Sequence, residues 1–496
     1  MRRLALVAVA LTAACGSTVQ VQGTAQLGGT GGELGTGTTT TGTGVVPGTS
    51  VPGSVGSSPL PGVGAAGPGS TSGSAAGGAS SSGGAGPTAP GTVAQGTVLA
   101  GGPGYTAKEI RLGFSTSNDA AKALGAAGLG VAVADQEELV KTWLAKVNAE
   151  GGIAGRKVVP VFYDYDATGD VQTSDQAACN RWTQDTLVFA ASGVRAGTSG
   201  SGDNLTPCLA RKGVAWLNGS GDAQKWTQYL DAMYSTLNMS RTREARVLVE
   251  SLAQQGFFTA GAKIGVIIND NQDDMSRAVK QGMEPALAKL GRKIDKRFVV
   301  SLAQTESSNA ELQMAAAGIT HVLFAAPGGA GASSFMQAAE SQGRTYRYGI
   351  SSQDAPGLTV QALAPAKQAK NAVGYGYQPG LDVDASNQPS PTPAMRACFD
   401  HYRSKGFQTS SLNQAAMGLI CDSVNLLRRG LAGQTNPTRA SFAAVVNGLG
   451  SSFGAASTFS TLFTPTQHDG IGGYRDLYYA TDCSCFRYRG PVRPIR

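Results

Sequence analysis

The chain has 496 residues, a formal net charge of +7 and only 15% charged residues, a length that predicts two or three domains. A nucleic-acid-binding protein concentrates its basic side chains on one face or in one run. Here like charges form only short clusters, such as Arg428-Arg429 and a tail containing Arg487, Arg489, Arg493 and Arg496. We therefore expect no nucleic-acid partner.

The first fifteen residues have the pattern of a secretory signal, because two arginines precede an apolar run, Leu4–Leu11, and small residues lead to Cys15. The pattern resembles a bacterial lipoprotein signal, in which the cysteine is lipidated and becomes the mature N-terminus, although Thr12 stands where that signal usually has leucine. Residues 1–14 are thus a predicted signal peptide, and Cys15 is the predicted lipid anchor at the outer face of the cell membrane. The alternative is an ordinary secreted protein cleaved nearby.

A low-complexity tract follows, holding 28 of the 69 glycines in residues 16–104, one charged residue (Glu33) and no aromatic residue before Tyr105. It buries too little apolar surface to offset its chain entropy, so residues 15–104 are predicted to be a disordered linker. Its root-mean-square reach is roughly 50 Å. A GxGxxG match at 62–67 has no strand before it and no helix after it, and we interpret it as chance.

From Glu109 onward, apolar runs alternate with amphipathic segments, which predicts an α/β fold of parallel sheets flanked by helices. The expected strands are 110–114, 158–163, 187–191, 214–217, 264–268, 321–325 and 346–350. The expected helices are 134–148, 172–183, 276–290, 310–317 and 332–341. In the first helix, Leu139, Trp143, Leu144 and Val147 form one apolar stripe, and Gly151-Gly152 marks its end.

The run Val147–Val158, followed by a strand ending at Tyr163–Asp166, resembles the first βαβ unit of type I periplasmic binding proteins of branched-chain amino-acid ABC importers. Looser matches extend the resemblance over residues 105–496. It implies two α/β lobes joined by three crossings, with a hinge between them and the ligand at the carboxyl ends of the strands, as in open α/β sheets generally. Lobe one is expected at 105–237 plus 373–445, and lobe two at 238–372 plus 446–496.

Candidate catalytic residues are few. The three histidines, His321, His401 and His468, lack partner motifs. Ser452 lies in a GxSxG match (450–454), but a helical stretch precedes it where a nucleophile elbow needs a strand. Cys483-Ser484-Cys485 has no second close cysteine pair and no histidine at ligand spacing, which favours a disulfide over a metal site. We expect no enzyme, no metal site and no cofactor.

Small and polar residues instead gather where the predicted strands end, which favours a binding site. The candidate ligand-binding residues are Ser117, Asn118, Ser192, Gly193, Asn218, Gly219, Ser220, Asp270, Asn271, Pro327, Gly328, Gln353, Asp354 and Tyr375. The resemblance assigns a ligand carboxylate to the loops at 192–193 and 218–220. The alternative is that these loops only reflect the glycine and serine bias of the chain.

Three features of the sequence bear on the identity of the ligand. Where the family places an aromatic side chain over the ligand, this chain has Asn271-Gln272-Asp273-Asp274, so the ligand need not be a branched-chain amino acid. Tyr375 and Tyr377 either supply an aromatic wall or pack in the core. For a ligand ammonium the resemblance favours Asp354 over Asp270, although Asp354 also fits a turn-capping role.

The resemblance therefore predicts a monomeric, surface-tethered receptor that binds a small polar ligand, such as an amino acid, and delivers it to an ABC permease. A ligand sensor for a signalling or wall protein is the alternative, and a serine hydrolase using Ser452 is the weaker one.

Seven cysteines in an exported chain leave one odd, and assigning Cys15 to a lipid leaves six for disulfides. We expect Cys179–Cys208, from a helix and the next helical segment around one strand, and Cys398–Cys421, between antiparallel helices. Cys483–Cys485 remains by difference, and exchange of these two with Cys398 or Cys421 stays open among the possible pairings.

Overall fold

The computed structural model describes residues 99–119, 133–195, 203–269, 274–300 and 304–495. The signal peptide, Cys15 and most of the expected linker lie outside these residues. Ala100 already belongs to the described fold, because it donates its N–H to the carbonyl of Thr435 at 3.1 Å and accepts from Nη2 of Arg156 at 2.9 Å. The linker boundary predicted at residue 104 is therefore too late.

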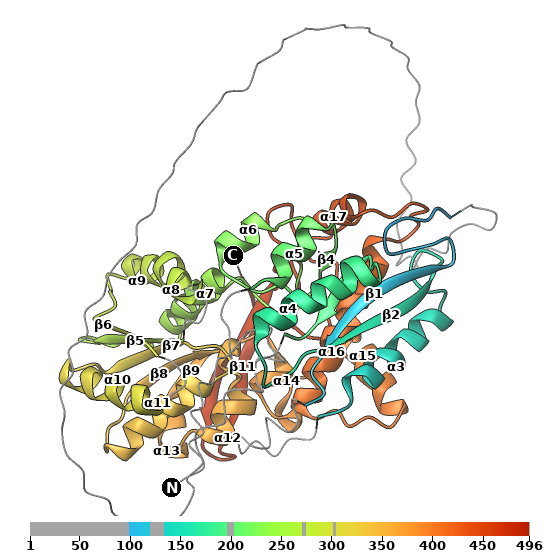
Figure 1. The fold of residues 1–496 in the computed structure, drawn as a ribbon. Helices are drawn as coiled ribbons and strands as arrows, with labels where there is room; N and C mark the ends of the chain where they lie inside the picture. Colours follow the sequence, from blue (N-terminus) through green and yellow to red (C-terminus); the bar gives the residue numbers. More distant parts are fainter. Residues whose placement is uncertain (1–98, 120–132, 196–202, 270–273, 301–303, 496) are drawn as a thin grey trace, which may run out of the picture. The chain divides into compact units, whose positions relative to one another are not determined.

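The first sheet has the strand order β2-β1-β3-β4, and all its strands are parallel (Figure 1). Its strands are β1 (Glu109–Thr116), β2 (Lys157–Asp164), β3 (Ala190–Gly193) and β4 (Ala215–Trp216). Its helices are α3 (Gln136–Ala149), α4 (Val171–Asn180) with the π-helical turn η1 (Arg181–Asp185), α5 (Leu205–Arg211) and α6 (Ala223–Gln228). The strand expected at 187–191 starts three residues later, and Leu187 is 45% exposed.

The second sheet has the order β11-β10-β9-β8-β7-β5-β6. Its strands are β5 (Ile264–Ile268), β6 (Lys296–Val299), β7 (His321–Ala325), β8 (Arg347–Ser351), β9 (Ala372–Gly376), β10 (Gly473–Ala480) and β11 (Cys485–Pro494). Its helical elements are α7 (Arg241–Gln254), α8 (Asp274–Ala278), η2 (Val279–Met283), α9 (Glu284–Lys289), α10 (Gln304–Ala316), α11 (Ala330–Ser341), η3 (Ser352–Asp354), η4 (Pro356–Val360), α12 (Gln361–Leu363) and α13 (Ala366–Ala369).

The second sheet is mixed, which differs from the parallel sheets expected. Strand β10 is antiparallel to both β9 and β11. The turn between β10 and β11 is short, and a short turn can join only antiparallel neighbours. The prediction of parallel strands holds for β5 to β9.

Three connecting segments join the two sheets: residues 229–240, residues 377–392 with α14 (Pro379–Asp382) and η5 (Ala385–Asn387), and residues 448–472. Between the second and third segments lie α15 (Pro393–Ser404), α16 (Ser411–Gly430) and α17 (Arg439–Asn447), which pack in the core of the first sheet.

Two expected lobe boundaries are wrong. The boundary at 373 falls inside β9, which pairs with β8 and β10 in the second sheet. The boundary at 446 is too early, because Phe453 and Phe463 are buried in the core of the first sheet. Both errors arise from hydrogen bonds and contacts between segments that are distant in sequence.

Alternating side chains of the buried strands face opposite layers, as strand geometry requires. Ile264, Val266 and Ile268 pack against α7 to α9, and Ile267 packs against α10 and α11. In Figure 1 these two groups of helices lie on opposite faces of the second sheet.

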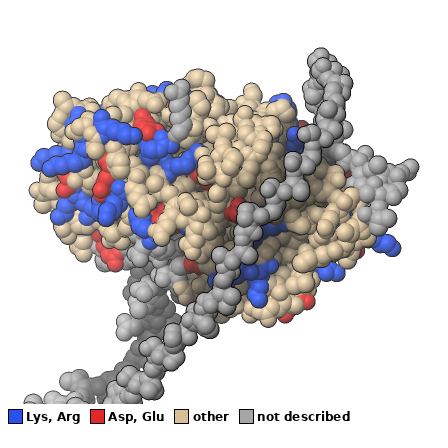
Figure 2. All heavy atoms as spheres, turned by 90° about the horizontal axis from the view of Figure 1, so that it is seen from above, with Lys and Arg blue, Asp and Glu red and all other residues tan. Residues whose placement is uncertain are grey.

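Basic side chains are less evenly spread than the sequence indicates. Figure 2 shows lysine and arginine gathered at the end of the molecule that carries α9 and β6 in Figure 1. Lys289, Lys293 and Arg297 are exposed there. The concentration arises because α9 and β6 are joined by a short basic loop.

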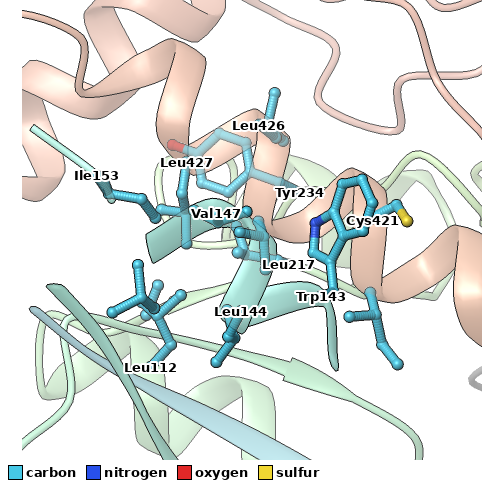
Figure 3. Packing of buried hydrophobic residues seen from close by; sticks show 14 of the residues in the cluster. Leu112, Trp143, Leu144, Val147, Ile153, Leu217, Tyr234, Cys421, Leu426 and Leu427 are labelled. Carbon is cyan, nitrogen blue, oxygen red and sulfur yellow. The ribbon is translucent and has the colours of Figure 1, made fainter. Parts of the chain in front are cut away.

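The predicted apolar stripe of α3 is confirmed. Leu139, Trp143, Leu144 and Val147 are each at most 3% exposed, and Figure 3 shows the stripe beside Cys421, Leu426 and Leu427 of α16. The helix ends at the double glycine as predicted, since Gly151 and Gly152 have φ of 94° and 71°.

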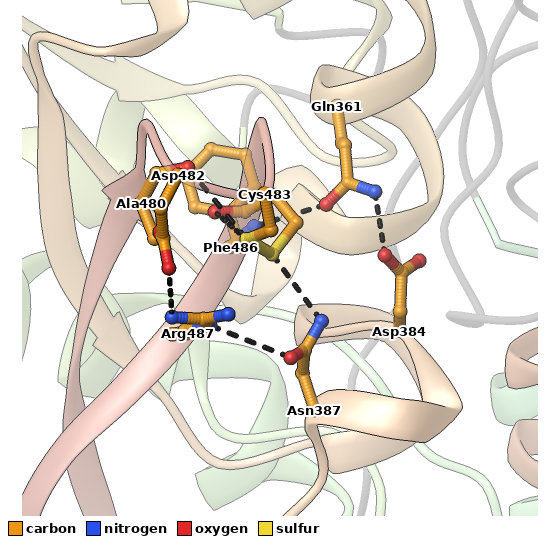
Figure 4. Close-up of a disulfide and its surroundings, with 9 residues drawn as sticks. Gln361, Asp384, Asn387, Ala480, Asp482, Cys483, Phe486 and Arg487 are labelled. Carbon is orange, nitrogen blue, oxygen red and sulfur yellow. Dashed lines mark hydrogen bonds and ion pairs between the residues drawn. A yellow bond between two sulfur atoms is a disulfide. The ribbon is translucent and has the colours of Figure 1, made fainter.

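The three disulfides join Cys179 to Cys208, Cys398 to Cys421 and Cys483 to Cys485, which confirms the expected pairing. The first joins α4 to α5, and the second joins α15 to α16. Around the third, Asn387 donates from Nδ2 to Sγ of Cys485 at 3.2 Å, and Arg487 pairs with Asp482 at 2.8 Å (Figure 4).

No helix in the described ranges is long and apolar enough to span a membrane.

Candidate functional site

The carboxyl ends of β1, β3 and β4 bring three of the predicted loops to one edge of the first sheet. Asn218 donates from Nδ2 to the carbonyl of Gly193 at 2.8 Å, and Ser115 donates from Oγ to the carbonyl of Val194 at 2.5 Å. Gly193 has φ of 125°, and an added Cβ would lie 2.2 Å from the carbonyl oxygen of Ser115. Only glycine fits this close approach of two strands.

The predicted polar side chains at this edge also form hydrogen bonds to other elements of the fold. Ser192 and Ser423 share a hydrogen bond of 2.7 Å, which ties β3 to α16. Asn218 accepts from Nδ2 of Asn238 at 2.9 Å, which ties the edge to the first connecting segment. Ser117, Ser192 and Asn218 are all at most 2% exposed, whereas Asn118 is exposed.

Behind this edge is a buried ion pair that the sequence analysis missed. Arg195 binds Asp175 through Nε at 2.8 Å and Nη2 at 2.5 Å, and Tyr165 donates to the same carboxylate at 2.9 Å. Arg195 and Asp175 are 3% and 0% exposed. The pair anchors the chain after β3 to α4, and Arg195 just after Gly193 was the available sequence signal.

At the second sheet, the predicted loops after β7 and β8 lie together. The N–H of Gly328 donates to the carbonyl of Gln353 at 2.6 Å. Pro327 and Gly328 are buried, and Gln353 is half-buried. Asp270 and Asn271 lie outside the described residues.

Asp354 has one engaged and one unengaged carboxylate oxygen. Its Oδ2 accepts from the N–H of Ser351 at 2.8 Å, which caps the turn η3 as the capping interpretation predicts. Its Oδ1 is buried and has no hydrogen-bond partner among the described residues. The capping role therefore leaves one acceptor of Asp354 available.

A buried polar network extends from Asp354 through residues that the sequence analysis did not select. Asp382 accepts at Oδ2 from Ser352 Oγ at 2.8 Å and from Tyr488 at 2.5 Å. Tyr377 donates its hydroxyl to Oε1 of Glu244 in α7. Within the described ranges, Oδ1 of Asp382 and Oε2 of Glu244 have no partner.

A sequence signal for Glu244 did exist. It lies three and four residues before Val247 and Leu248, on the buried face of α7, where a carboxylate is unusual. Asp382 follows a proline in a short helical turn and carries no comparable signal.

Burial shifts the ionisation of these carboxyls. It raises the pKa of Asp354 to about 8 and that of Asp382 to about 7, against the opposing effect of their hydrogen bonds. Burial also raises the pKa of Glu244 well above its ordinary value; Tyr377 and Arg241 oppose the rise, and the charge of Asp354 adds to it. Burial therefore favours the neutral form of both carboxyls, and for Glu244 it does so despite the charge of Arg241.

Tyr375 packs in the core of this structure, as the second of the two interpretations weighed for it describes. It is 0% exposed and donates its hydroxyl to the carbonyl of Glu244 at 3.1 Å. Its ring packs against Tyr377 and Tyr474 at centroid distances of 6.2 and 5.3 Å. Core packing was one of the two interpretations, and it is the one this structure shows, because strand alternation points the Tyr375 side chain at α7.

The residues considered for catalysis have structural roles. His321 bonds to Thr320 and to the carbonyl of Phe257, and His468 bonds to Asn447 and to the carbonyl of Leu230. Ser452 follows α17 in a turn and donates to the carbonyl of Leu449 at 2.6 Å.

The ring of His401 packs against the ring of Trp143, with 5.7 Å between the two ring centroids. Across the described part of the chain, no group of three or more His, Cys, Asp or Glu side chains is placed to hold a metal ion.

Comparisons with known proteins agree with this architecture. A family model described as periplasmic binding protein matches residues 130–475. A substrate-binding protein of an ABC transporter from Desulfitobacterium hafniense, solved with leucine, is 18% identical with a TM-score of 0.53, over 77% of this chain and 100% of that chain. A branched-chain amino acid ABC transporter protein from Thermus thermophilus, solved with valine, is 16% identical with a TM-score of 0.58, over 78% and 96%.

A fatty acid ABC transporter substrate-binding protein from Thermomonospora curvata is 15% identical with a TM-score of 0.56, over 80% of this chain and 95% of that chain. A search of curated proteins finds no match. The family model covers more than half of the chain, and the solved structures share its fold. The chain therefore belongs to the periplasmic binding protein family, with the fold of ABC transporter substrate-binding proteins.

Proposed function

We propose that this protein is a receptor that captures a small polar ligand between the strand ends of its two sheets and delivers it to the permease of an ABC importer. The observation that supports the proposal is an architecture of two sheets with polar strand-end loops, joined by three connecting segments, in a chain of the periplasmic binding protein family. Hinge motion about such segments closes the two halves on a ligand. Export and tethering through Cys15 at the outer face of the membrane belong to the same proposal.

The proposed ligand carries an amine. Oδ1 of Asp354 and Oε2 of Glu244 are buried acceptors without partners in the described part of the chain. Desolvated acceptors are costly unless a donor reaches them, and an ammonium supplies donors together with the charge that would ionise both carboxyls. Asp354 is 0% exposed, so ligand entry requires the surrounding segments to move apart.

The proposed ligand also carries a carboxylate, by analogy with solved relatives whose bound molecules are named as leucine, valine and p-hydroxybenzoic acid. The loops at 192–193 and 218–220 supply the small residues that let backbone groups approach an anion. An amino acid or a related amino-carboxylate fits both halves of the site.

The test begins with mass spectrometry of the small molecules released when the purified protein is denatured. The identified compound is then titrated calorimetrically into wild type and Asp354→Asn, which keeps the capping oxygen and removes the charge. Loss of an ion pair in a closed site should weaken binding by about 2–5 kcal/mol.

Asp185→Asn is the matched control, because Asp185 is exposed on η1. Equal affinity of Asp354→Asn and wild type would contradict the role of Asp354 and argue against an amine. Failure of any released or added solute to bind would contradict the receptor proposal itself.

A further inference from the structure

A cavity of about 350 Å³ lies where the three connecting segments meet, a volume typical of small-molecule sites. Leu237 of the first segment, Gln378 and Pro391 of the second, and Ala456 and Ser457 of the third all line it. We call this cavity the hinge pocket. Within the described ranges, none of the predicted strand-end residues lines it, and Gln378 connects it to the buried polar network by donating its N–H to Oδ2 of Asp382 at 2.9 Å.

Hydrogen bonds at the hinge pocket link the connecting segments directly. Gln378 donates from Nε2 to the carbonyl of Leu237 at 2.6 Å, which joins the first and second segments. Ser457 donates from Oγ to the carbonyl of Thr236 at 2.9 Å, which joins the first and third. A molecule in this pocket would therefore contact all three connections between the sheets.

The lining combines an apolar floor with two cations at its edge. Met395, Phe399 and Ala415 are buried and supply the floor. Arg396 and Arg403, seven residues apart on α15, are exposed lining residues on the same side of the helix. Among the described residues, no aspartate or glutamate lines the pocket, so the charge of its lining favours an anion.

Both guanidinium groups keep donors for a ligand. Arg396 donates to the carbonyl of Pro391 at 2.5 Å, and Arg403 pairs with Asp400, which does not line the pocket. Each guanidinium has five N–H donors in a fork that matches a carboxylate.

Gln378, which lines the pocket, also has a buried side-chain oxygen without a donor among the described residues. Gln378 is 3% exposed, its Nε2 is engaged with Leu237, and its Oε1 has no hydrogen-bond partner among the described residues. Because an unsatisfied buried carbonyl is costly, an occupant with a hydroxyl or amide donor would be favoured here.

We infer that the hinge pocket binds a small amphipathic carboxylate that carries a hydroxyl or amide donor, and that its occupancy ties the three connecting segments together. The apolar body packs on Met395 and Phe399, the carboxylate meets Arg396 and Arg403, and the donor meets Gln378.

The test uses 3-phenyllactate as the probe and the purified full chain with ¹³C-methyl-labelled methionine, so that Met395 reports from inside the pocket. Met395→Leu assigns its resonance. A saturable shift of this resonance at millimolar probe is expected, and Arg396→Ala/Arg403→Ala should weaken binding by about tenfold. Arg429→Ala is the control, because Arg429 is exposed on α16 and does not line the pocket.

The uncharged amide of the probe, and 3-phenylpropionate without its hydroxyl, should each bind more weakly. Hydrogen exchange should slow in residues 229–240, 377–392 and 448–472 when 3-phenyllactate is bound. Absence of a Met395 shift up to about 10 mM probe, or a shift that is equal in the double arginine variant and wild type, would overturn the inference. Neither result bears on the proposed receptor function, whose site lies at the strand ends.

Discussion

Asp382 concentrates several hydrogen bonds on one carboxylate oxygen and leaves the other without a partner in the described ranges. Ser352, Tyr488 and the N–H of Gln378 all donate to Oδ2, which joins η3, β11 and the second connecting segment. The residue is 0% exposed. Such a group favours its neutral form in the folded protein, because desolvation outweighs the hydrogen bonds.

This ionisation predicts a pH-dependent stability. The pKa of Asp382 is raised to about 7 in the folded chain, against about 3.9 when unfolded. The folded state therefore binds more protons between these values, and this contribution is fully present below about pH 3.9 and is lost as the pH rises through about 7. Asp382→Asn should make the fall in stability shallower by up to about 1.4 kcal/mol per pH unit.

Urea denaturation at several pH values from about 5 to about 7 measures these slopes. Asp185→Asn, at an exposed position, should follow wild type. Identical slopes for Asp382→Asn and wild type would show that the carboxyl titrates alike in both states.

At the scale of elements, disulfides fasten helices that lie side by side. Cys179 is the last buried residue of α4. Its disulfide partner Cys208 lies in α5, 29 positions later in the sequence. Cys483 and Cys485 are only two positions apart at the β10–β11 turn. A disulfide limits the unfolded chain more strongly when it closes a longer loop.

Removing Cys179–Cys208 with paired alanines should therefore cost about 3–4 kcal/mol of unfolding free energy, measured by urea denaturation under non-reducing conditions. The matched Cys483→Ala/Cys485→Ala variant should lose less than about 2 kcal/mol. An equal or larger loss at the β10–β11 turn would show that loop length does not govern these bonds.

At the scale of the whole molecule, the described residues begin at 99, and the glycine-rich tract precedes them in the sequence. Arg156 holds this beginning in place. It is 0% exposed and donates to the carbonyls of Ala100, Thr106 and Thr435. One buried guanidinium therefore ties residues 100 and 106 to the segment before α17.

The tether proposal makes its own prediction. Wild type should fractionate with membranes and require detergent for release, whereas Cys15→Ser should appear in the medium, because one acyl-bearing residue is the only proposed anchor. Immunoblotting of membrane and medium fractions measures the distribution, and Cys483→Ser/Cys485→Ser controls for general effects of cysteine loss. Wild type that is soluble without detergent would remove the lipid assignment.

The sequence alone predicted the features that depend on neighbours along the chain. The strands 264–268 and 321–325, the stripe of α3 and its double-glycine end all follow from side-chain periodicity or from backbone freedom at one position. The strand-end loops at 192–193 and 218–220 met at one edge because parallel neighbours place their carboxyl ends together.

Only the tertiary structure decided what depends on distant partners. β9 joined the second sheet through β10, a strand about a hundred residues later, and that pairing overrode the boundary expected at 373. Tyr375 became a core residue, and Glu244 and Gln378 became buried acceptors, each because of groups far away in sequence. The cap of Asp354 is local, but only the folded chain buries its second carboxylate oxygen. Periodicity identifies which side chains are buried; it does not identify their partners, and the partners determine which polar atoms remain available for a ligand.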